Sequence, residues 1–473
     1  MNILKAIDEN VKHMDLITRP NATPGLWLCL LLPFAYLSNT FRNPYSSQTF
    51  EYKMTRLASI GLCMQSVNFF LYVIFGGRRF VRMILSFVPG FFTAALFCKF
   101  LHQNLSVSLF WGHLYCISYQ YAFIKFIRKL PKCFTLGEAA LVSQGFTLYL
   151  FTTILQIPYF ITNPAHDDFN KMNSIMMEGI ICVLIFVWIV STIKIFQKTI
   201  LFYFLLLFFI CIIFCIPVTP DLPIVEVLNF ILSDSRRIFI IIFYCGMTGL
   251  SIATVAWQVN KSEKATTSVR KIFHFLLVVV YIPGLLYQCT FLYISTGVAF
   301  CAIILLEFMR VFEIYPFDKI LKQSFNVFAD EKDAGSVALT PFYLLVGCSA
   351  PLWINSSTCG VDNNFIAPNS LLILISGVLT VGIGDTAASV FGSKLGRHKL
   401  PNSEKSFEGL IANIILQGLT VAQLFSLNLV VLNNIQISLT AASIIFVAVI
   451  EAYTDQVDNI VLPLVFFILA NFI

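Results

Sequence analysis

The stretch from Gly382 to Gly409 places glycines, carboxylates and basic side chains together in a chain that is otherwise mostly apolar. It reads GIGDTAASVFGSKLGRHKLPNSEKSFEG. Glycine allows the backbone to approach an anion closely, and peptide N–H groups in a turn or at a helix start bind phosphate. We therefore predict a phosphate-binding segment whose close approaches occur at four glycines, Gly382, Gly384, Gly392 and Gly396.

Two carboxylates of this stretch are candidate metal ligands. Asp385 directly follows an apolar run, where an unpaired carboxylate is costly. A divalent cation would offset that cost, and because Mg²⁺ is commonly held by one or two carboxylates plus phosphate oxygens, we predict Asp385 and Glu408 as its ligands. The alternative is an ordinary basic loop beside a glycine-rich packing face, which leaves both carboxylates without a role. Positive charge for a polyphosphate comes from four neighbours, Lys394, Arg397, Lys399 and Lys405.

Two further polar clusters carry candidate site residues. In RKIFH, the residues Arg270, Lys271 and His274 fall within one turn of a helix start, where cations are disfavoured, so an anion held between them is one explanation. A basic flank that orients the helix in a membrane is the other. In EAYTDQVDN, three carboxylates precede the last apolar run, with Asp458 nearest to it. Asp458 could pair with a second metal or with Lys405, and an exposed acidic turn is the alternative.

The elements that must position these residues are membrane-spanning helices. Of the 473 residues, 58% are hydrophobic, 12% are charged and 48 are phenylalanine, which is typical of a protein within a bilayer. About 20 mostly apolar residues cross the hydrocarbon core as a helix, and runs of about that length recur along the chain. Because the runs are continuous rather than alternating, they exclude a transmembrane β-barrel. We predict an all-α, polytopic membrane helix bundle with about fifteen transmembrane helices. The candidate spans lie near 25–41, 56–75, 83–101, 105–127, 137–162, 175–196, 199–217, 237–258, 272–289, 290–308, 338–354, 369–392, 409–427, 435–450 and 459–473.

We divide the chain into two parts. Residues 1–258 hold aromatic spans with little polar chemistry, and we expect a multi-span membrane region that could shape a lipid groove. Residues 259–473 hold the polar clusters and the candidate site. The first 25 residues have no apolar core of signal-peptide type, and we expect a short polar tail. Thirteen cysteines are scattered without a C-x-x-C motif, so we expect neither a disulfide framework nor a zinc site.

The order of the spans predicts that the polar clusters share one side of the membrane. Helical hairpins between the clusters return the chain to the same side each time. The loop 355–369 on the opposite side has no Lys or Arg and contains a glycosylation sequon at Asn355. Because loops rich in Lys and Arg face the cytoplasm, we assign the clusters to the cytoplasmic face and expect no nucleic-acid partner for the basic loops. The five clusters lie at 268–275, 305–317, 328–340, 382–409 and 451–463.

Five motifs in residues 259–473 resemble the CTP-dependent polyprenol kinase family, most closely its dolichol-phosphorylating members. In order, they are RKIFHF, LLEFMR, DEKDAGSVALTPFYLLVG, the stretch from Gly382 to Gly409, and EAYTDQVDNIVLP. The resemblance implies transfer of the γ-phosphoryl group of CTP to the terminal hydroxyl of dolichol, giving dolichyl phosphate as the lipid carrier for protein glycosylation. It implies a multi-pass protein of the endoplasmic reticulum membrane whose site faces the cytosol. One departure is Leu400 before Pro401, where many relatives have Trp, and it concerns the wall of the nucleotide pocket.

With that expected function, we assign roles to the candidate residues. Asp385 would hold Mg²⁺, Lys405 and Arg397 would meet the polyphosphate charge, and Asp458 would orient or deprotonate the acceptor hydroxyl or hold metal. Two alternatives stay open: a CTP-using cytidylyltransferase, which releases pyrophosphate, and a secondary transporter, whose site would lie near the membrane midplane. The predicted nucleotide-binding set is Gly382, Gly384, Gly392, Gly396, Arg397, Lys399, Lys405, Ser406, Glu408, Gly409, Arg270, Lys271 and His274.

Overall fold

A computed structural model of the chain describes residues 3–41, 49–75, 79–162, 167–261, 263–329, 331–355, 359 and 368–473. These residues are largely α-helical and contain no β-strand, apart from an isolated bridge between Lys399 and Ser406. The predicted all-α class is therefore confirmed. The first ten helices are α1 (Ile3–His13), α2 (Leu31–Ser38), α3 (Phe50–Phe75), α4 (Arg79–Leu101), α5 (Leu105–Lys129), α6 (Leu136–Thr162), α7 (Asp168–Thr192), α8 (Thr199–Cys215), α9 (Pro223–Leu232) and α10 (Ser235–Asn260).

The predicted second part of the chain, residues 259–473, follows α10. Its helices are α11 (Thr267–Tyr287), α12 (Cys289–Val311), α13 (Asp318–Phe328), α14 (Thr340–Ile354), α15 (Pro368–Leu374), α16 (Thr386–Leu395), α17 (Phe407–Ser426), α18 (Asn434–Tyr453) and α19 (Asp458–Ala470). A π-helical segment, Val378–Asp385, lies between α15 and α16.

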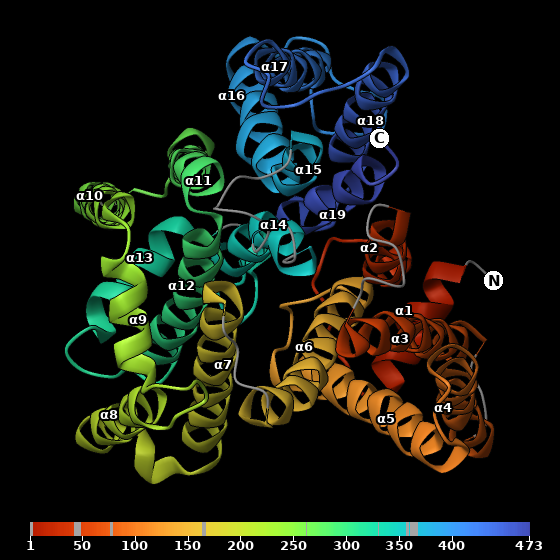
Figure 1. The fold of residues 1–473 in the computed structure, drawn as a ribbon. Helices are drawn as coiled ribbons and strands as arrows, with labels where there is room; N and C mark the ends of the chain where they lie inside the picture. Colours follow the sequence, from red (N-terminus) through yellow and green to blue (C-terminus); the bar gives the residue numbers. More distant parts are fainter. Residues whose placement is uncertain are drawn as a thin grey trace.

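The helices form groups that meet around α19 (Figure 1). Helices α1 to α6 lie together, α7 to α13 form a second group, and α15 to α18 form a third. Helix α19 packs against α14 and α2, so it joins the third group to the N-terminal one. Its side chains Val461, Leu462, Phe466 and Phe467 are fully buried. The end of the chain is thus the centre of the apolar core.

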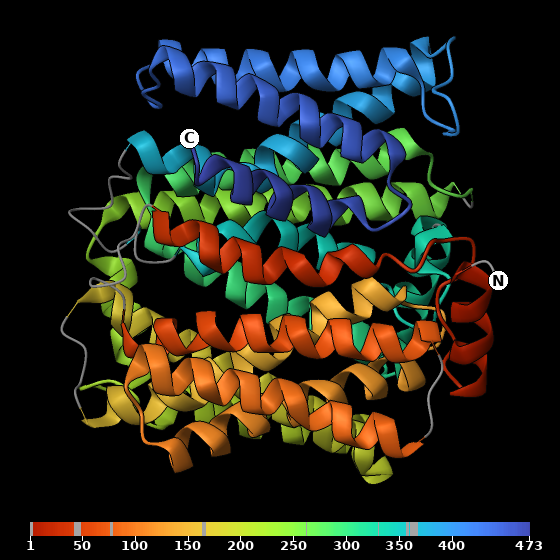
Figure 2. The same cartoon turned by 90° about the vertical axis from the view of Figure 1, so that its right-hand side faces the viewer.

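Many of the long helices run side by side across the molecule (Figure 2). The described residues contain seven helices that are long and apolar enough to cross a membrane: α3, α7, α10, α11, α12, α17 and α18. Several other apolar helices are shorter, among them α8, α14 and α19. Helix α10 leaves large apolar side chains uncovered, with Phe239 71% and Ile252 64% exposed. Exposed apolar surface of this extent is expected where lipid covers the protein.

The N-terminal segment differs from the predicted polar tail. Residues Ile3–His13 form an amphipathic helix, α1, which lies across the direction of the long helices (Figure 2). Ile7 and Val11 are buried in the core, and Asn10 Nδ2 donates to the carbonyl of Val73 at the end of α3. The polar composition conceals this helix because its apolar residues are few but fall on one face.

The structure also contains a disulfide bond that the sequence did not indicate. Cys289 at the start of α12 is bonded to Cys359, and their Cα atoms are 5.3 Å apart. The two cysteines are 70 residues apart in the chain. Only the packing of α12 against α14 brings their segments together, so cysteine spacing did not reveal the pair.

Candidate functional site

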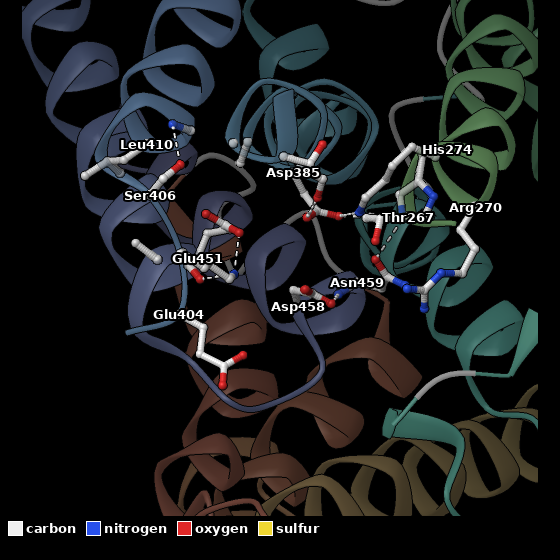
Figure 3. Close-up of a pocket in the computed structure, with 18 of the residues that line it drawn as sticks. Thr267, Arg270, His274, Asp385, Glu404, Ser406, Leu410, Glu451, Asp458 and Asn459 are labelled. Carbon is white, nitrogen blue, oxygen red and sulfur yellow. Dashed lines mark hydrogen bonds and ion pairs between the residues drawn. The ribbon is translucent and has the colours of Figure 1, made fainter. Parts of the chain in front are cut away.

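A cavity of about 380 Å³ lies where helix ends from the second part of the chain converge (Figure 3). Helices α11, α14, α17 and α19 begin there, α18 ends there, and α16 runs along the cavity. Its size is that of a small-molecule site. Residues from four of the five predicted polar clusters line it, so these four clusters meet in one place. The polar and charged lining residues include Thr267, Arg270, Lys271, His274, Lys332, Asp385, Ser389, Lys399, Glu404, Lys405, Ser406, Glu451, Asp458 and Asn459.

Asp385 is the centre of one charged group in this cavity. The residue is 2% exposed, at the end of the π-helical segment, and its carboxylate accepts from Lys271 Nζ. His274 Nε2 lies 3.6 Å from the same carboxylate and 3.3 Å from Asn459 Oδ1. Figure 3 shows Asp385 and His274 turned toward one another. The predicted cluster in α11 therefore faces the predicted metal ligand directly.

Asp458, the first residue of α19, belongs to a second pair. Lys332 Nζ lies 2.9 Å from its carboxylate and also reaches the carbonyl of Gln456, at 3.4 Å. Lys332 was not among the predicted site residues. It is a single basic residue between acidic ones in DEKDAG, and only folding brings it to a partner far along the chain.

Lys405 forms a third pair, with Glu451 at the end of α18. Its ammonium donates to both the side chain and the carbonyl of Glu451. Burial acts to lower the pKa of Lys405, but the charges of Glu451 and Asp458 outweigh it, so the pKa lies above the usual lysine value. Lys405 is therefore a cation at neutral pH. Glu451 is a site residue that we did not predict, although its cluster was recognised.

Glycines bring α16 and α17 close together beside the cavity. A Cβ atom on Gly409 would lie 2.8 Å from the carbonyl of Ala388 and 3.2 Å from Cα of Gly392. Ser406 begins α17, and its hydroxyl accepts from the backbone N–H of Gly409. Three of the predicted nucleotide-binding residues, Gly392, Ser406 and Gly409, line the cavity. The cap fixes where α17 starts and hence where Lys405 lies.

Gly382 and Gly384 do not form the phosphate-binding turn that we predicted. Both belong to the π-helical segment, and neither lines the cavity. A Cβ on Gly382 would lie 2.3 Å from Val278 Cγ2, and one on Gly384 would lie 2.5 Å from Gln417 Nε2. The two glycines thus allow this segment to pack tightly on α11 and α17. The close packing on α11 also brings Asp385, at the end of this segment, near Lys271 of the same helix.

The loop between α16 and α17 carries three more predicted site residues, and also Leu400, at the cavity edge or beyond it. Lys399 lines the cavity and donates to the carbonyl of Glu404. Gly396, Arg397 and Leu400 do not line it. Leu400 is buried within the loop, and its N–H donates to the carbonyl of Lys405.

Glu408 is also outside the cavity lining, although we predicted it as a metal ligand. Its carboxylate accepts from the backbone N–H of His398 and lies 2.7 Å from His398 Nδ1. These contacts close the loop between α16 and α17 and turn the carboxylate away from Asp385. Sequence spacing could not distinguish the two directions.

The remaining cluster supports the site from outside. Glu307 and Arg310, three residues apart on α12, form an ion pair, with 2.6 Å between Arg310 Nη2 and Glu307 Oε1. Arg310 also donates to the carbonyl of Ser336, and Glu307 accepts from the N–H of Ala338. The pair therefore holds the segment that leads into α14 beside the cavity.

The charge arrangement suits a phosphorylated ligand with a metal ion. Cations and carboxylates alternate around the cavity, so an incoming polyphosphate can exchange partners with Lys271, Lys332 and Lys405. The described residues contain no group of three or more His, Cys, Asp or Glu side chains arranged as a closed metal site. A metal held jointly by one or two carboxylates and ligand phosphates needs no such group.

Comparison with known proteins agrees with these features. The family profile described as dolichol kinase matches residues 101–400. Dolichol kinase of Mus musculus is 32% identical over 356 residues, which cover 72% of this chain and 65% of that protein. Dolichol kinase of Bos taurus is 31% identical with the same coverage. Dolichol kinase EVAN of Arabidopsis thaliana is 28% identical over 418 residues, covering 77% of this chain and 70% of that protein.

The chain thus spans just under two thirds of the length of its mammalian relatives. No solved structure matches it significantly. Because the family profile covers more than half of its residues, the chain belongs to the dolichol kinase family.

Proposed function

We propose that the protein phosphorylates dolichol, or a closely related polyprenol, with CTP as donor. The observation that carries the proposal is the cavity of paired cations and carboxylates at the ends of membrane-length helices, in a chain of the dolichol kinase family. An acceptor made of isoprene units is reached from within the bilayer, whereas a nucleotide is reached only from water. A site at the rim of a helix bundle can meet both.

In the proposed reaction, the terminal hydroxyl oxygen of the polyprenol attacks the γ-phosphorus. The bond from this phosphorus to the bridging oxygen breaks, and CDP leaves. Such a transfer depends mainly on positioning and on stabilising the charge of the phosphoryl oxygens. We assign that charge stabilisation to Lys405 and Lys271, with Arg397 at the outer edge. Asp458 would orient the hydroxyl and accept its proton, once a bound nucleotide has drawn Lys332 away.

Asp385 would hold a divalent cation, most simply Mg²⁺, together with phosphate oxygens. When bound, the cation would neutralise part of the polyphosphate charge. The carboxylates that fit this role in the cavity are Asp385 first, and then Glu451 and Asp458. Glu408 would need to leave His398 to contribute.

We further propose about fifteen membrane crossings in the endoplasmic reticulum, with the cavity on the cytosolic side and with residues 259–473 as the catalytic part. The proposal adds the shorter apolar helices to the seven long ones. The disulfide between Cys289 and Cys359 supports the assigned sides. Cys289 follows the end of α11 that is opposite to the cavity, and disulfides persist in oxidising compartments such as the lumen.

This topology can be tested by labelling. A single cysteine at Lys399, in an otherwise cysteine-free variant that retains activity, should react with an impermeant maleimide from the cytosolic side of sealed microsomes. Asn355 should face the lumen, although the two serines after it in its sequon lie outside the described residues. Labelling of the cysteine at position 399 only after the lumen is opened would reverse the assigned sides.

The activity itself is tested with purified protein, a polyprenol in detergent and each of the four nucleoside triphosphates labelled on the γ-phosphate. We expect label to pass to the polyprenol from CTP, with CDP as the second product. Release of pyrophosphate would instead indicate a cytidylyltransferase. Movement of a substrate across vesicles without its conversion would indicate a transporter.

A further inference from the structure

The segment that immediately precedes Asp458 is held by the N-terminal part of the chain. Asp455, Gln456 and Val457 connect α18 to α19, and each makes hydrogen bonds to residues before α7. We name residues 455–457 the α19 lead. The sequence of the N-terminal part indicated no catalytic or binding residues. These contacts connect that part of the chain to the candidate site.

A buried ion pair forms the first half of this hold. Arg19 Nη2 donates to Glu138 Oε1 at 2.6 Å, and both side chains are almost fully buried. The same carboxylate oxygen accepts from the backbone N–H of Val457 at 3.0 Å, and Arg19 donates to the carbonyl of Asp455 at 3.1 Å. The pair therefore binds both ends of the α19 lead.

Contacts from Thr23 and Thr135 complete the hold. Asp455 accepts from the hydroxyl of Thr23 at 2.9 Å. Gln456 accepts from the hydroxyl of Thr135 at 2.7 Å and donates to the carbonyl of Thr23 at 3.0 Å. Every residue of the α19 lead thus has partners in the N-terminal part.

The burial of this pair favours a role beyond stability. Burying two charges is costly, and well-packed apolar residues often stabilise a fold equally well. Glu138 also accepts from the N–H of Thr135 at the start of its own helix, at 2.9 Å, so one carboxylate fixes α6 and the lead to α19 together. The N–H of Val457 is one of the amide groups that a helix start leaves without an intrahelical partner.

The residue after the α19 lead is Asp458, and the next is Asn459, which contacts His274. We infer that Arg19 and Glu138 are positioning residues of the N-terminal part, which fix the backbone of the α19 lead and thereby the direction of Asp458 in the cavity. The inference rests on the proposed function, in which Asp458 meets the acceptor hydroxyl.

The principal test is Glu138→Gln in the full chain, purified in detergent. The amide keeps the shape of the side chain but loses the charge that binds Arg19 and the N–H of Val457. We expect kcat to fall at least about tenfold, because small misplacements of a reacting group are costly in rate. The KM values for CTP and polyprenol should stay within about threefold, since the nucleotide contacts are untouched.

Two companion variants make the result specific. Gln144→Met removes buried hydrogen bonds of the same helix, to Cys29 O at 3.1 Å and Ser66 Oγ at 3.0 Å, without touching the α19 lead. Its kcat should stay within about twofold of wild type. Thr23→Val lies on the surface and should fold, and loss of its hydroxyl contacts to Asp455 and Gln456 should lower kcat about threefold.

Hydrogen exchange gives a readout that does not depend on activity. The amides of Val457 and Asn459 should exchange faster in Glu138→Gln and in Thr23→Val than in wild type. If wild type transfers no phosphate to any polyprenol, the proposed function is wrong. The exchange rates alone then decide whether Glu138 and Thr23 fix the α19 lead. If wild type is active but Thr23→Val and folded Glu138→Gln keep its kcat and its exchange rates, the inference is overturned.

Discussion

Asp385→Asn is expected to lower phosphoryl transfer by at least about 10², as is found when a charge-stabilising element of an active site is removed. The substitution keeps the shape of the side chain and removes its charge. In the structure this carboxylate is buried and paired with Lys271, at the junction of the π-helical segment and α16. In the proposed reaction it is also the first ligand of the divalent cation.

Loss of activity alone would not separate these two roles, so the dependence on Mg²⁺ must be measured. If Asp385 holds the cation, the residual activity of Asp385→Asn should need a higher Mg²⁺ concentration for half of its maximum. If it only neutralises Lys271, that concentration should not change. Near-normal activity of the variant would reassign Asp385 to helix packing.

Glu307→Gln is the matched control for Asp385→Asn. It removes a carboxylate of similar burial from an ion pair with Arg310, outside the cavity. We expect less folded protein, since breaking such a pair leaves a charge without its partner. The Mg²⁺ dependence of the folded fraction should match that of wild type.

Lys405→Arg is expected to lower turnover about 10²-fold, although it preserves the positive charge. The ammonium of Lys405 donates to two oxygens of one residue, Glu451, at the cavity lining. A guanidinium is broader and planar, so it cannot occupy the same point and would meet a phosphate oxygen in a different position. If Lys405 served only to orient the loop toward the cytosol, arginine would replace it without loss.

Lys399→Arg provides the comparison. Lys399 is exposed at the cavity edge, where its contact is with a carbonyl of the same loop. A wider head group is easily accommodated there, so the loss should be far smaller than for Lys405→Arg. The measurement is label transfer from CTP in membranes that contain equal amounts of each variant. Equal rates for wild type and Lys405→Arg would remove Lys405 from the site.

The sequence by itself determined the all-α class of the protein, and the polar clusters that it marked include the four that line the cavity. Long apolar runs require helices in a bilayer, because a backbone in hydrocarbon must satisfy its own hydrogen bonds. The number and order of those runs, with basic residues gathered in alternate loops, then indicated which clusters share a side. The ion pair of Glu307 and Arg310 could also be predicted, since residues three apart on a helix are neighbours.

Only the tertiary structure decided which side chains meet within the site. Lys271 pairs with Asp385, Lys332 with Asp458, and Lys405 with Glu451. Each pair joins different helices or loops, so its formation depends on how those helices are rotated and how closely they pack. An acidic or basic residue at a helix end has several possible partners until that rotation is known.

The same reason explains the residues whose positions differ from expectation. Glycines in the sequence GIGD are compatible with a turn or with close helix packing. In the structure they belong to a helical segment that packs against Val278 and Gln417. Glu138, in the first turn of α6, gave no signal in the sequence of its connection to the start of α19. Contacts between distant segments form only when the core has assembled. They depend on all the packing interactions of that core together, so no short stretch of the sequence reveals them.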